Sequence, residues 1–211
     1  MRTNLVKART SMINTVRGTL RAQGYRMGSC TTRRFVARYA EVSLDASLAE
    51  ALDPLIETLA ELTDRIDALE ADLVAEARSD ELLKRLQTVP GVGPLVSLAF
   101  VAWMDSPERF QRSRDVGASL GLRPSLRSSG GREVRGRITR EGDSEMRRLL
   151  VQAAHSTLRC RQDFTLKRWA ERLAERVGKR KALVALARKL GVLLHHLWVT
   201  GDSFRPFPQA S

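Results

Sequence analysis

The most regular pattern of hydrophobic positions lies between residues 48 and 73, where leucine or isoleucine recurs at alternating steps of four and three. The positions are Leu48, Leu52, Leu55, Leu59, Leu62, Ile66, Leu69 and Leu73. Such a repeat predicts a long helix with a coiled-coil seam, in which Leu48, Leu55, Leu62 and Leu69 take the d positions and the other four residues take the a positions. We expect this seam to form a homo-oligomer through residues 48–73. The alternative is an amphipathic helix that packs on its own domain.

The start of the long helix depends on Pro54. If the helix begins near Asp53, Pro54 falls in its first turn, where a missing N–H has little cost; an earlier start would make a kink at Pro54.

Two further helices are expected before the seam. Between residues 2 and 24, apolar residues recur at helical spacing among arginines, which predicts one basic helix. A short helix is expected at residues 33–39, after a Gly/Ser break.

After residue 81 the pattern predicts a helix, a Pro-Gly-Val-Gly-Pro turn and a second, strongly apolar helix. This arrangement resembles the helix-hairpin-helix module, in which backbone N–H groups of the turn hold a DNA phosphate without reading bases. On that interpretation Gly91, Val92 and Gly93 contact nucleic acid. The alternative is a tight interhelical turn that needs Gly91 and Gly93 only for its backbone conformation.

The remaining sequence also predicts helices. We expect a cap at Ser106, short helices that end at Gly121 and Pro124, and two longer helices over residues 143–160 and 163–197, with at most a short hairpin at residues 133–138. The fold class is therefore mainly α. We divide the chain into a basic helical segment (1–40), a coiled coil (41–81) and a domain with a helix-hairpin-helix-like element (82–211).

Charge is distributed unevenly within the net charge of +12. Residues 1–40 carry nine Arg or Lys and no acid, residues 41–81 carry thirteen acids against two arginines, and the remainder is basic. Arginine binds phosphate through a planar fork, so this composition favours a nucleic-acid partner over an acidic membrane surface. Cys30 and Cys160 lack the spacing of a metal or redox motif, and no continuous apolar run is long enough to span a bilayer. We expect a cytoplasmic protein without a membrane partner.

The candidate chemistry lies in a basic, turn-rich stretch in which two serines precede two glycines. A serine hydroxyl beside Gly130 and Gly131 can approach a phosphate closely. Seven arginines between residues 127 and 148 supply neutralising charge. The expected nucleic-acid-binding residues here are Arg127, Gly130, Gly131, Arg132, Arg135, Arg137, Arg140 and Arg147. A flexible loop without function is the alternative interpretation.

Four motifs stand in one order along the chain: LLKRLQTVPGVGP, FQRSRDVGASLGLRP, SSGG followed by GRITREGDSEMRRLL, and KALVALARKLGVLLHHLW. Together they resemble the carboxy-terminal transposase domain of the bacterial insertion-sequence family one-ten, which includes Piv-type DNA invertases and bridge-RNA-guided recombinases. The resemblance implies an enzyme whose serine hydroxyl attacks a DNA phosphodiester and forms a covalent phosphoserine. In the family pattern this serine precedes a glycine, five positions after the proline of GLxP. The resemblance therefore assigns the nucleophile to Ser129, with Ser128 as the second choice.

The resemblance also implies partners and a cofactor that this chain does not hold alone. Family members carry an amino-terminal RuvC-like domain whose four acidic residues bind divalent metal, whereas residues 1–40 contain no acid. We therefore expect a truncated transposase that binds no cofactor by itself, with Mg²⁺ in a full-length complex. The implied partners are DNA and a guide (bridge) RNA. The alternatives are a catalytically silent DNA- or RNA-binding module and a coiled-coil assembly subunit.

Overall fold

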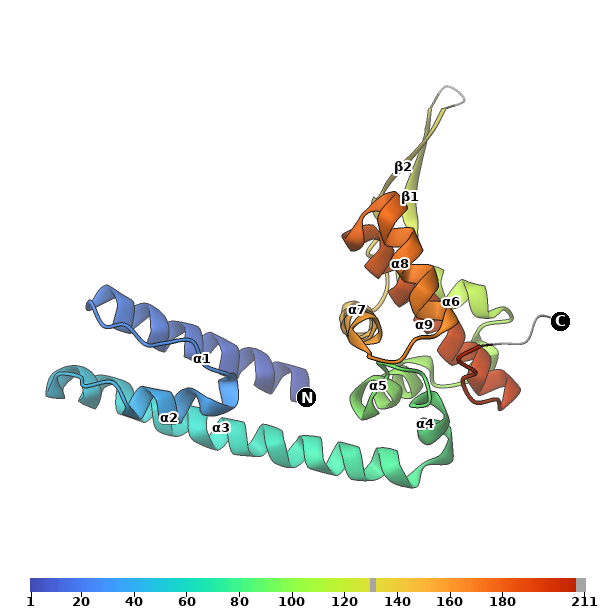
Figure 1. Ribbon diagram of the computed structural model, residues 1–211. Helices are drawn as coiled ribbons and strands as arrows, with labels where there is room; N and C mark the ends of the chain where they lie inside the picture. Colours follow the sequence, from blue (N-terminus) through green and yellow to red (C-terminus); the bar gives the residue numbers. More distant parts are fainter. Residues whose placement is uncertain (130–131, 208–211) are drawn as a thin grey trace. The chain divides into compact units, whose positions relative to one another are not determined.

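Helices account for most of the chain, as the apolar spacing predicts, and one two-stranded sheet interrupts them (Figure 1). The computed structural model describes residues 1–129 and 132–207. It divides into two units, Met1–Asp72 (unit 1) and Leu73–Ser211 (unit 2). The basic amino-terminal segment and most of the long helix therefore form one unit.

Unit 1 contains α1 (Arg2–Ala22), a short 3₁₀ turn (Thr32–Arg34), α2 (Phe35–Ala40) and most of α3 (Ala46–Ser79). One hydrophobic cluster joins the three α-helices through Ile13, Val16, Leu20, Phe35, Tyr39, Leu52, Ile56 and Leu59. Arg2 of α1 forms an ion pair with Glu70 of α3, and Arg33 pairs with Asp67 at 3.1 Å. The apolar stripe of α1 is thus the partner that α3 meets within its own chain.

The heptad seam of α3 divides into two sets by exposure. Three of the four a positions, Leu52, Leu59 and Ile66, are buried, with 6%, 0% and 0% of their surface exposed, and the fourth, Leu73, is half-buried. The d positions Leu48, Leu55, Leu62 and Leu69 are half-buried. Packing within the chain therefore accounts for the three buried a positions, and the d positions keep part of their apolar surface exposed.

The structure decides between the two starts that the sequence allowed for α3. The helix begins at Ala46 and not near Asp53, so Pro54 lies inside it. Burial of Leu52 against the unit 1 cluster favours the earlier start, and it offsets the backbone hydrogen bond that proline cannot donate. The carbonyl of Pro54 accepts a hydrogen bond from the Thr58 hydroxyl at 2.8 Å.

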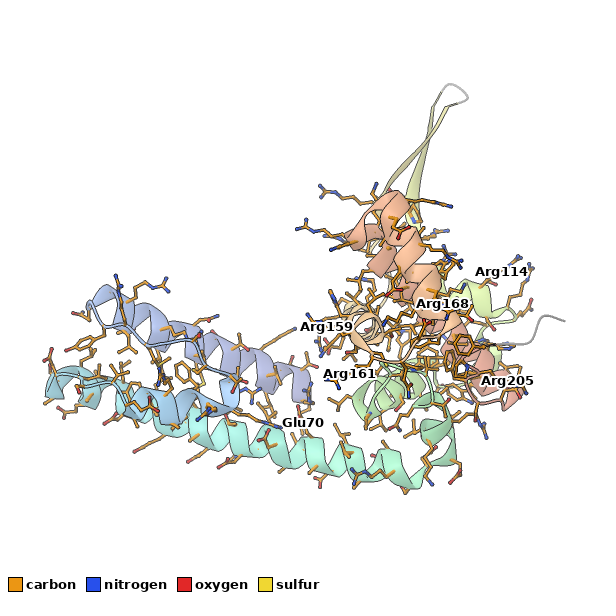
Figure 2. The ribbon with its side chains drawn as sticks, in the orientation of Figure 1. Glu70, Arg114, Arg159, Arg161, Arg168 and Arg205 are labelled. Atoms are coloured by element: carbon orange, nitrogen blue, oxygen red, sulfur yellow. The ribbon has the colours of Figure 1, made fainter. Side chains whose placement is uncertain are left out.

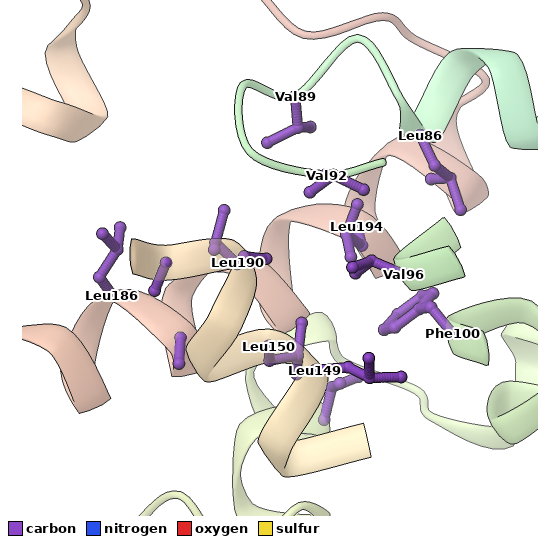
Figure 3. Close-up of a cluster of buried hydrophobic side chains, with 14 of the residues drawn as sticks. Leu86, Val89, Val92, Val96, Phe100, Leu149, Leu150, Leu186, Leu190 and Leu194 are labelled. Atoms are coloured by element: carbon purple, nitrogen blue, oxygen red, sulfur yellow. The ribbon is translucent and has the colours of Figure 1, made fainter. Parts of the chain in front are cut away.

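Unit 2 holds the remaining elements around one core. They are α4 (Glu81–Leu86), α5 (Pro94–Met104), a 3₁₀ turn (Pro107–Arg109), α6 (Ser113–Ser119), β1 (Pro124–Ser129), β2 (Arg132–Ile138), α7 (Ser144–Arg159), α8 (Thr165–Val177) and α9 (Lys179–Thr200). Figure 3 shows Leu186, Leu190 and Leu194 of α9 in the same cluster as Leu150 of α7 and Phe100 of α5. All five side chains are fully buried. The helix α9 therefore forms the centre of this core.

Three sequence expectations for unit 2 differ from the structure. The single helix expected at residues 163–197 is two helices, because Gly178 has φ +87°, which is outside the α-helical region, and α9 then continues to Thr200. The expected loop around the two serines is instead the end of a β-strand. The hairpin is longer than residues 133–138, since β1 starts at Pro124.

One described helix, α9, has the length and mean hydropathy of a segment that can cross a membrane. Its leucines Leu186, Leu190 and Leu194 are fully buried in unit 2. A central core helix of this kind passes the same test, so α9 is accounted for by packing.

Candidate nucleic-acid interface

The two candidate nucleophiles lie at the end of β1, on an antiparallel hairpin that stands away from the helices of unit 2 (Figure 1). Ser128 pairs with Glu133 and Ser129 pairs with Arg132 across the ladder. The two predicted glycines, Gly130 and Gly131, lie outside the described residues. Backbone pairing therefore fixes the main chain of both serines, and a strand replaces the expected loop.

The register also places the expected phosphate-binding arginines. Arg127 lies opposite Val134, Arg135 lies opposite Leu126, and Arg132 faces Ser129. Arg137 and Arg140 are exposed near the base of the hairpin. The hairpin thus brings Arg127, Arg132 and Arg135 onto the same ladder as the serines, while Arg137 and Arg140 flank its base.

The base of the hairpin is held by backbone hydrogen bonds and by one arginine. The Thr139 N–H donates to the Arg123 carbonyl at 3.0 Å, and the Arg140 N–H donates to the Gly121 carbonyl at 3.2 Å. The Nη1 of Arg147 donates to the carbonyls of Leu120, Glu141 and Gly142 at 3.0, 2.9 and 3.2 Å. Arg147 therefore braces the hairpin base, a contact that the sequence did not predict for it.

We expect Arg147→Gln to destabilise unit 2 by about 1–3 kcal/mol, because three carbonyls lose a charged donor. The matched variant is Arg148→Gln, which removes a neighbouring exposed arginine that pairs with Glu145 and should change stability by less than about 1 kcal/mol. Urea unfolding measures both effects. Equal stabilities for the two variants would show that the brace has no energetic role.

The Pro-Gly-Val-Gly-Pro turn between α4 and α5 packs on α7. The hydroxyl of Thr157 on α7 donates to the Pro90 carbonyl at 2.7 Å, and a Cβ on Gly91 would lie 2.6 Å from the Ala153 carbonyl oxygen. Val92 is 5% exposed, and its N–H donates to the Val89 carbonyl at 2.9 Å. The Val92 amide is therefore engaged within the turn and is not oriented toward a phosphate.

Gly93 is placed differently from Gly91, although both belong to the predicted phosphate-binding turn. It is the N-cap residue of α5, and a Cβ at Gly93 would meet nothing within 4 Å. The Gly93 carbonyl accepts the N–H groups of Val96 and Ser97, each at 3.0 Å. The partial positive charge of the α5 N-terminus is thus the part of this turn that suits an anion.

Basic side chains outside the predicted set enlarge the positive surface. Figure 2 labels five of these arginines, Arg114, Arg159, Arg161, Arg168 and Arg205. A further exposed group, Arg176, Lys179, Arg180 and Lys181, gathers where α8 passes into α9. The sequence pattern did not predict this group, because the basic residues after Gly178 fell within a helix that was expected to be continuous.

Some of these arginines are already paired with acids. A hydrogen bond from Arg168 lowers the pKa of the Asp163 carboxyl, and a hydrogen bond to Glu145 raises the pKa of Arg148. Both arginines therefore have a carboxylate that competes with phosphate. Arg137 and Arg140 are exposed, and no carboxylate lies at ion-pair distance from them among the residues whose side chains are described, so they are better placed to contact a nucleic-acid backbone.

No group of three or more His, Cys, Asp or Glu lies close enough to hold a metal ion in residues 1–129 and 132–207. The acids of α3 instead include partners of arginines, as Asp67 and Glu70 are for Arg33 and Arg2. The donor groups described in this chain therefore do not fit a magnesium site, and we assign no chemical step to a metal.

A family model described as the transposase IS116/IS110/IS902 family matches residues 83–169. The matched segment starts in α4, ends in α8 and includes the whole hairpin. It therefore covers both serines, the glycine turn and Arg147.

Curated relatives match over almost the entire chain. The transposase for insertion sequence element IS1111A of Coxiella burnetii is 33% identical over 97% of this chain and 58% of its own length. The "Probable family 20 transposase" of Pseudomonas aeruginosa is 34% identical over 98% of this chain and 63% of its own length. The transposase for insertion sequence element IS1328 of Yersinia enterocolitica is 30% identical over 97% and 62%. The chain spans about three fifths of the length of these relatives.

Proposed function

Because this chain belongs to the IS116/IS110/IS902 family of transposases, we propose that it takes part in DNA transposition and site-specific recombination through a serine nucleophile. The observation that carries the proposal is the position of Ser128 and Ser129 at the end of β1, inside the matched segment. This strand end belongs to a hairpin that projects from unit 2, away from its helices.

In the proposed reaction the Ser129 oxygen attacks a backbone phosphorus. A new Oγ–P bond forms, the bond from phosphorus to the leaving deoxyribose oxygen breaks, and that oxygen takes up a proton while the serine hydroxyl gives one up. A serine hydroxyl is a weak nucleophile without a base or a metal. The resemblance implies that Mg²⁺ is bound in a full-length complex, and its ligands would come from outside the residues described here.

The proposed contact with DNA is mostly to the backbone. Exposed arginines such as Arg137 and Arg140 neutralise phosphates, and neither the hairpin base nor the α5 N-terminus offers a set of side chains suited to reading base edges. A guide RNA, where present, would be held by the same backbone contacts while base pairing selects the target. A cytoplasmic location is part of this proposal, because bacterial DNA, the proposed substrate, lies in the cytoplasm.

Duplex binding should therefore weaken steeply with salt. Each phosphate contact contributes about −0.9 to the slope of log K against log salt concentration, so Arg137→Gln should make the slope less steep by about one unit. Arg148→Gln is the control, since Arg148 is paired with Glu145 and should leave the slope unchanged. Fluorescence anisotropy on random-sequence duplexes measures the slope. A flat salt titration of the unchanged protein would contradict the backbone model.

We propose that the half-buried d positions of α3 mediate the expected homo-oligomer. Leu48, Leu55, Leu62 and Leu69 keep apolar surface that the unit 1 cluster does not cover. Leu62→Glu should therefore lower the mass measured by light scattering without unfolding unit 1, because a buried charge at an interface costs several kcal/mol. Leu59→Ala is the contrasting variant, since Leu59 is fully buried within the chain and its truncation should cost about 2–5 kcal/mol of stability. An unchanged mass for Leu62→Glu would remove the proposal.

A catalytically silent nucleic-acid-binding module is the second candidate function. The observation that favours it is the lack of a metal-ligating cluster among the described residues. Both candidates predict the salt dependence above. They differ in whether a complete complex forms a covalent serine–DNA adduct.

A further inference from the structure

A pocket of about 430 Å³ lies in unit 2, between α8, α9 and the carboxy-terminal residues 202–206. Its apolar wall is formed by Leu166, Leu193, Leu197 and the indole of Trp169. This volume is within the range of pockets that bind small organic groups. The hairpin and the glycine turn do not contribute to it, so it is separate from the interface proposed above.

The carboxy-terminal side of the pocket is anchored to the rest of unit 2. The Thr165 N–H donates to the Pro206 carbonyl at 3.0 Å, and the Phe204 N–H donates to the Thr88 hydroxyl at 2.9 Å. The Phe204 ring packs edge-on against Phe164, with 5.8 Å between centroids. These contacts hold the pocket in a preformed shape, which lowers the entropy cost of binding.

The charged side chains that line the pocket are mostly cationic. Arg172, Lys189 and Arg205 line it together with one carboxylate, Asp202. The nearby acids Asp163 and Glu171 are paired with Arg168 and Lys167. Within the described part of the chain, the three lining cations have no carboxylate at ion-pair distance, so they remain able to bind an anion.

We propose that this pocket binds one unpaired base of a nucleic-acid strand, with the indole of Trp169 as the stacking surface and Arg172, Lys189 and Arg205 around the adjoining phosphates. The proposal deepens the proposed function, because it rests on nucleic acid as the partner. An aromatic ring with apolar neighbours suits the flat face of a base, and cations at the rim suit its phosphates. A base inside an intact duplex has both faces stacked, so the occupant is a single-stranded or frayed segment.

Lys189 connects the two halves of the pocket. Its Nζ lies 4.3 Å from the centroid of the Trp169 ring, as a cation–π contact. The lysine stem is flexible, so its ammonium can leave the ring for a phosphate when a base takes its place. One nucleotide then stacks its base on the indole of Trp169 while its phosphate contacts the ammonium of Lys189.

The test compares a short single-stranded oligothymidylate with an abasic strand of equal length and charge, by fluorescence anisotropy with the full chain. The base-bearing strand should bind about 5 to 150 times more tightly, the factor expected for stacking one base. Trp169→Leu should reduce this preference to near one and leave binding of the abasic strand unchanged. Phe207→Leu removes an exposed aromatic ring outside the pocket and should keep the preference.

A photo-crosslink in the unsubstituted protein tests the same contact without a variant that could fail to fold. A strand with 5-iodouracil should crosslink to the peptide that contains Trp169, for a deoxyribose or a ribose strand, and the stronger of the two identifies DNA or RNA as the source of the base. Equal binding of base-bearing and abasic strands, or crosslinks only at other peptides, would overturn the proposal. Either result would leave the salt-dependent duplex binding and the serine adduct intact, so failure of the pocket is distinguishable from failure of the proposed function.

Discussion

Ser129→Ala is expected to abolish the covalent protein–DNA adduct, a loss of at least about a thousandfold, because the nucleophilic oxygen is absent. DNA binding should change little, since alanine keeps the β1 main chain and every arginine of the hairpin. The measurement is a denaturing gel of labelled DNA, with a complete complex that includes the metal-binding domain implied by the resemblance and a divalent ion. For this 211-residue chain alone we expect no adduct.

Ser128→Ala is the matched control for the nucleophile. Ser128 precedes Ser129 on β1, so its replacement leaves the Ser129 hydroxyl in the chain and the ladder with β2 in place. The adduct should persist in Ser128→Ala. An adduct that survives in Ser129→Ala and disappears in Ser128→Ala would move the nucleophile by one residue, and survival in both would exclude this hairpin as its source.

Gly91→Ala is expected to destabilise unit 2 by about 3 kcal/mol or more, which is a large part of the stability of a typical domain. Gly91 has φ +93°, and a Cβ there would lie 2.4 Å from the Thr157 Oγ1 and 2.6 Å from both the Ala153 carbonyl oxygen and the Thr157 nitrogen. Two of these neighbours are backbone atoms of α7, so they cannot move aside cheaply. Urea unfolding of unit 2 measures the loss.

Gly93→Ala separates packing of this turn on α7 from binding of a phosphate by the turn. A Cβ at Gly93 would meet nothing within 4 Å, so we expect a stability change below about 1 kcal/mol, as for other changes at a helix N-cap. If the turn holds a phosphate through the α5 N-terminus, duplex binding in Gly93→Ala should weaken without unfolding. A Gly91→Ala protein as stable as the Gly93→Ala protein would contradict the packing described for α7.

The apolar spacing predicted where helices form, because a helix that buries one face must repeat its hydrophobic residues every three or four positions. It did not predict the partner of that face. The spacing of Leu52 and Leu59 is compatible with packing against another copy of the chain and with packing against α1. Only the structure, in which Ile13 and Val16 lie in the same cluster, shows that they pack against α1. Self-association through the d positions stays a prediction.

The hairpin was harder to predict for a different reason. The sequence of β1 has no alternation of apolar and polar residues, so its extended conformation depends on the ladder with β2. The hydrogen bonds of Arg147 to the hairpin base could not be predicted from the sequence either, since their acceptors are the backbone carbonyls of residues 120, 141 and 142. The serine site itself came from the resemblance, and its assignment stays untested.

A small rotation at the base of the projecting hairpin produces a larger displacement at Ser129, near its far end. A strand of this length extends about 20 Å, so a rotation of about 5° at the base moves the tip by about 2 Å. Reaction rates fall about a hundredfold for a misplacement of about 1 Å. In the proposed reaction, the hydrogen bonds of Arg147 at the hairpin base would therefore influence how accurately Ser129 meets a phosphate, so the geometry of strand exchange would depend on residues far from the bond that breaks.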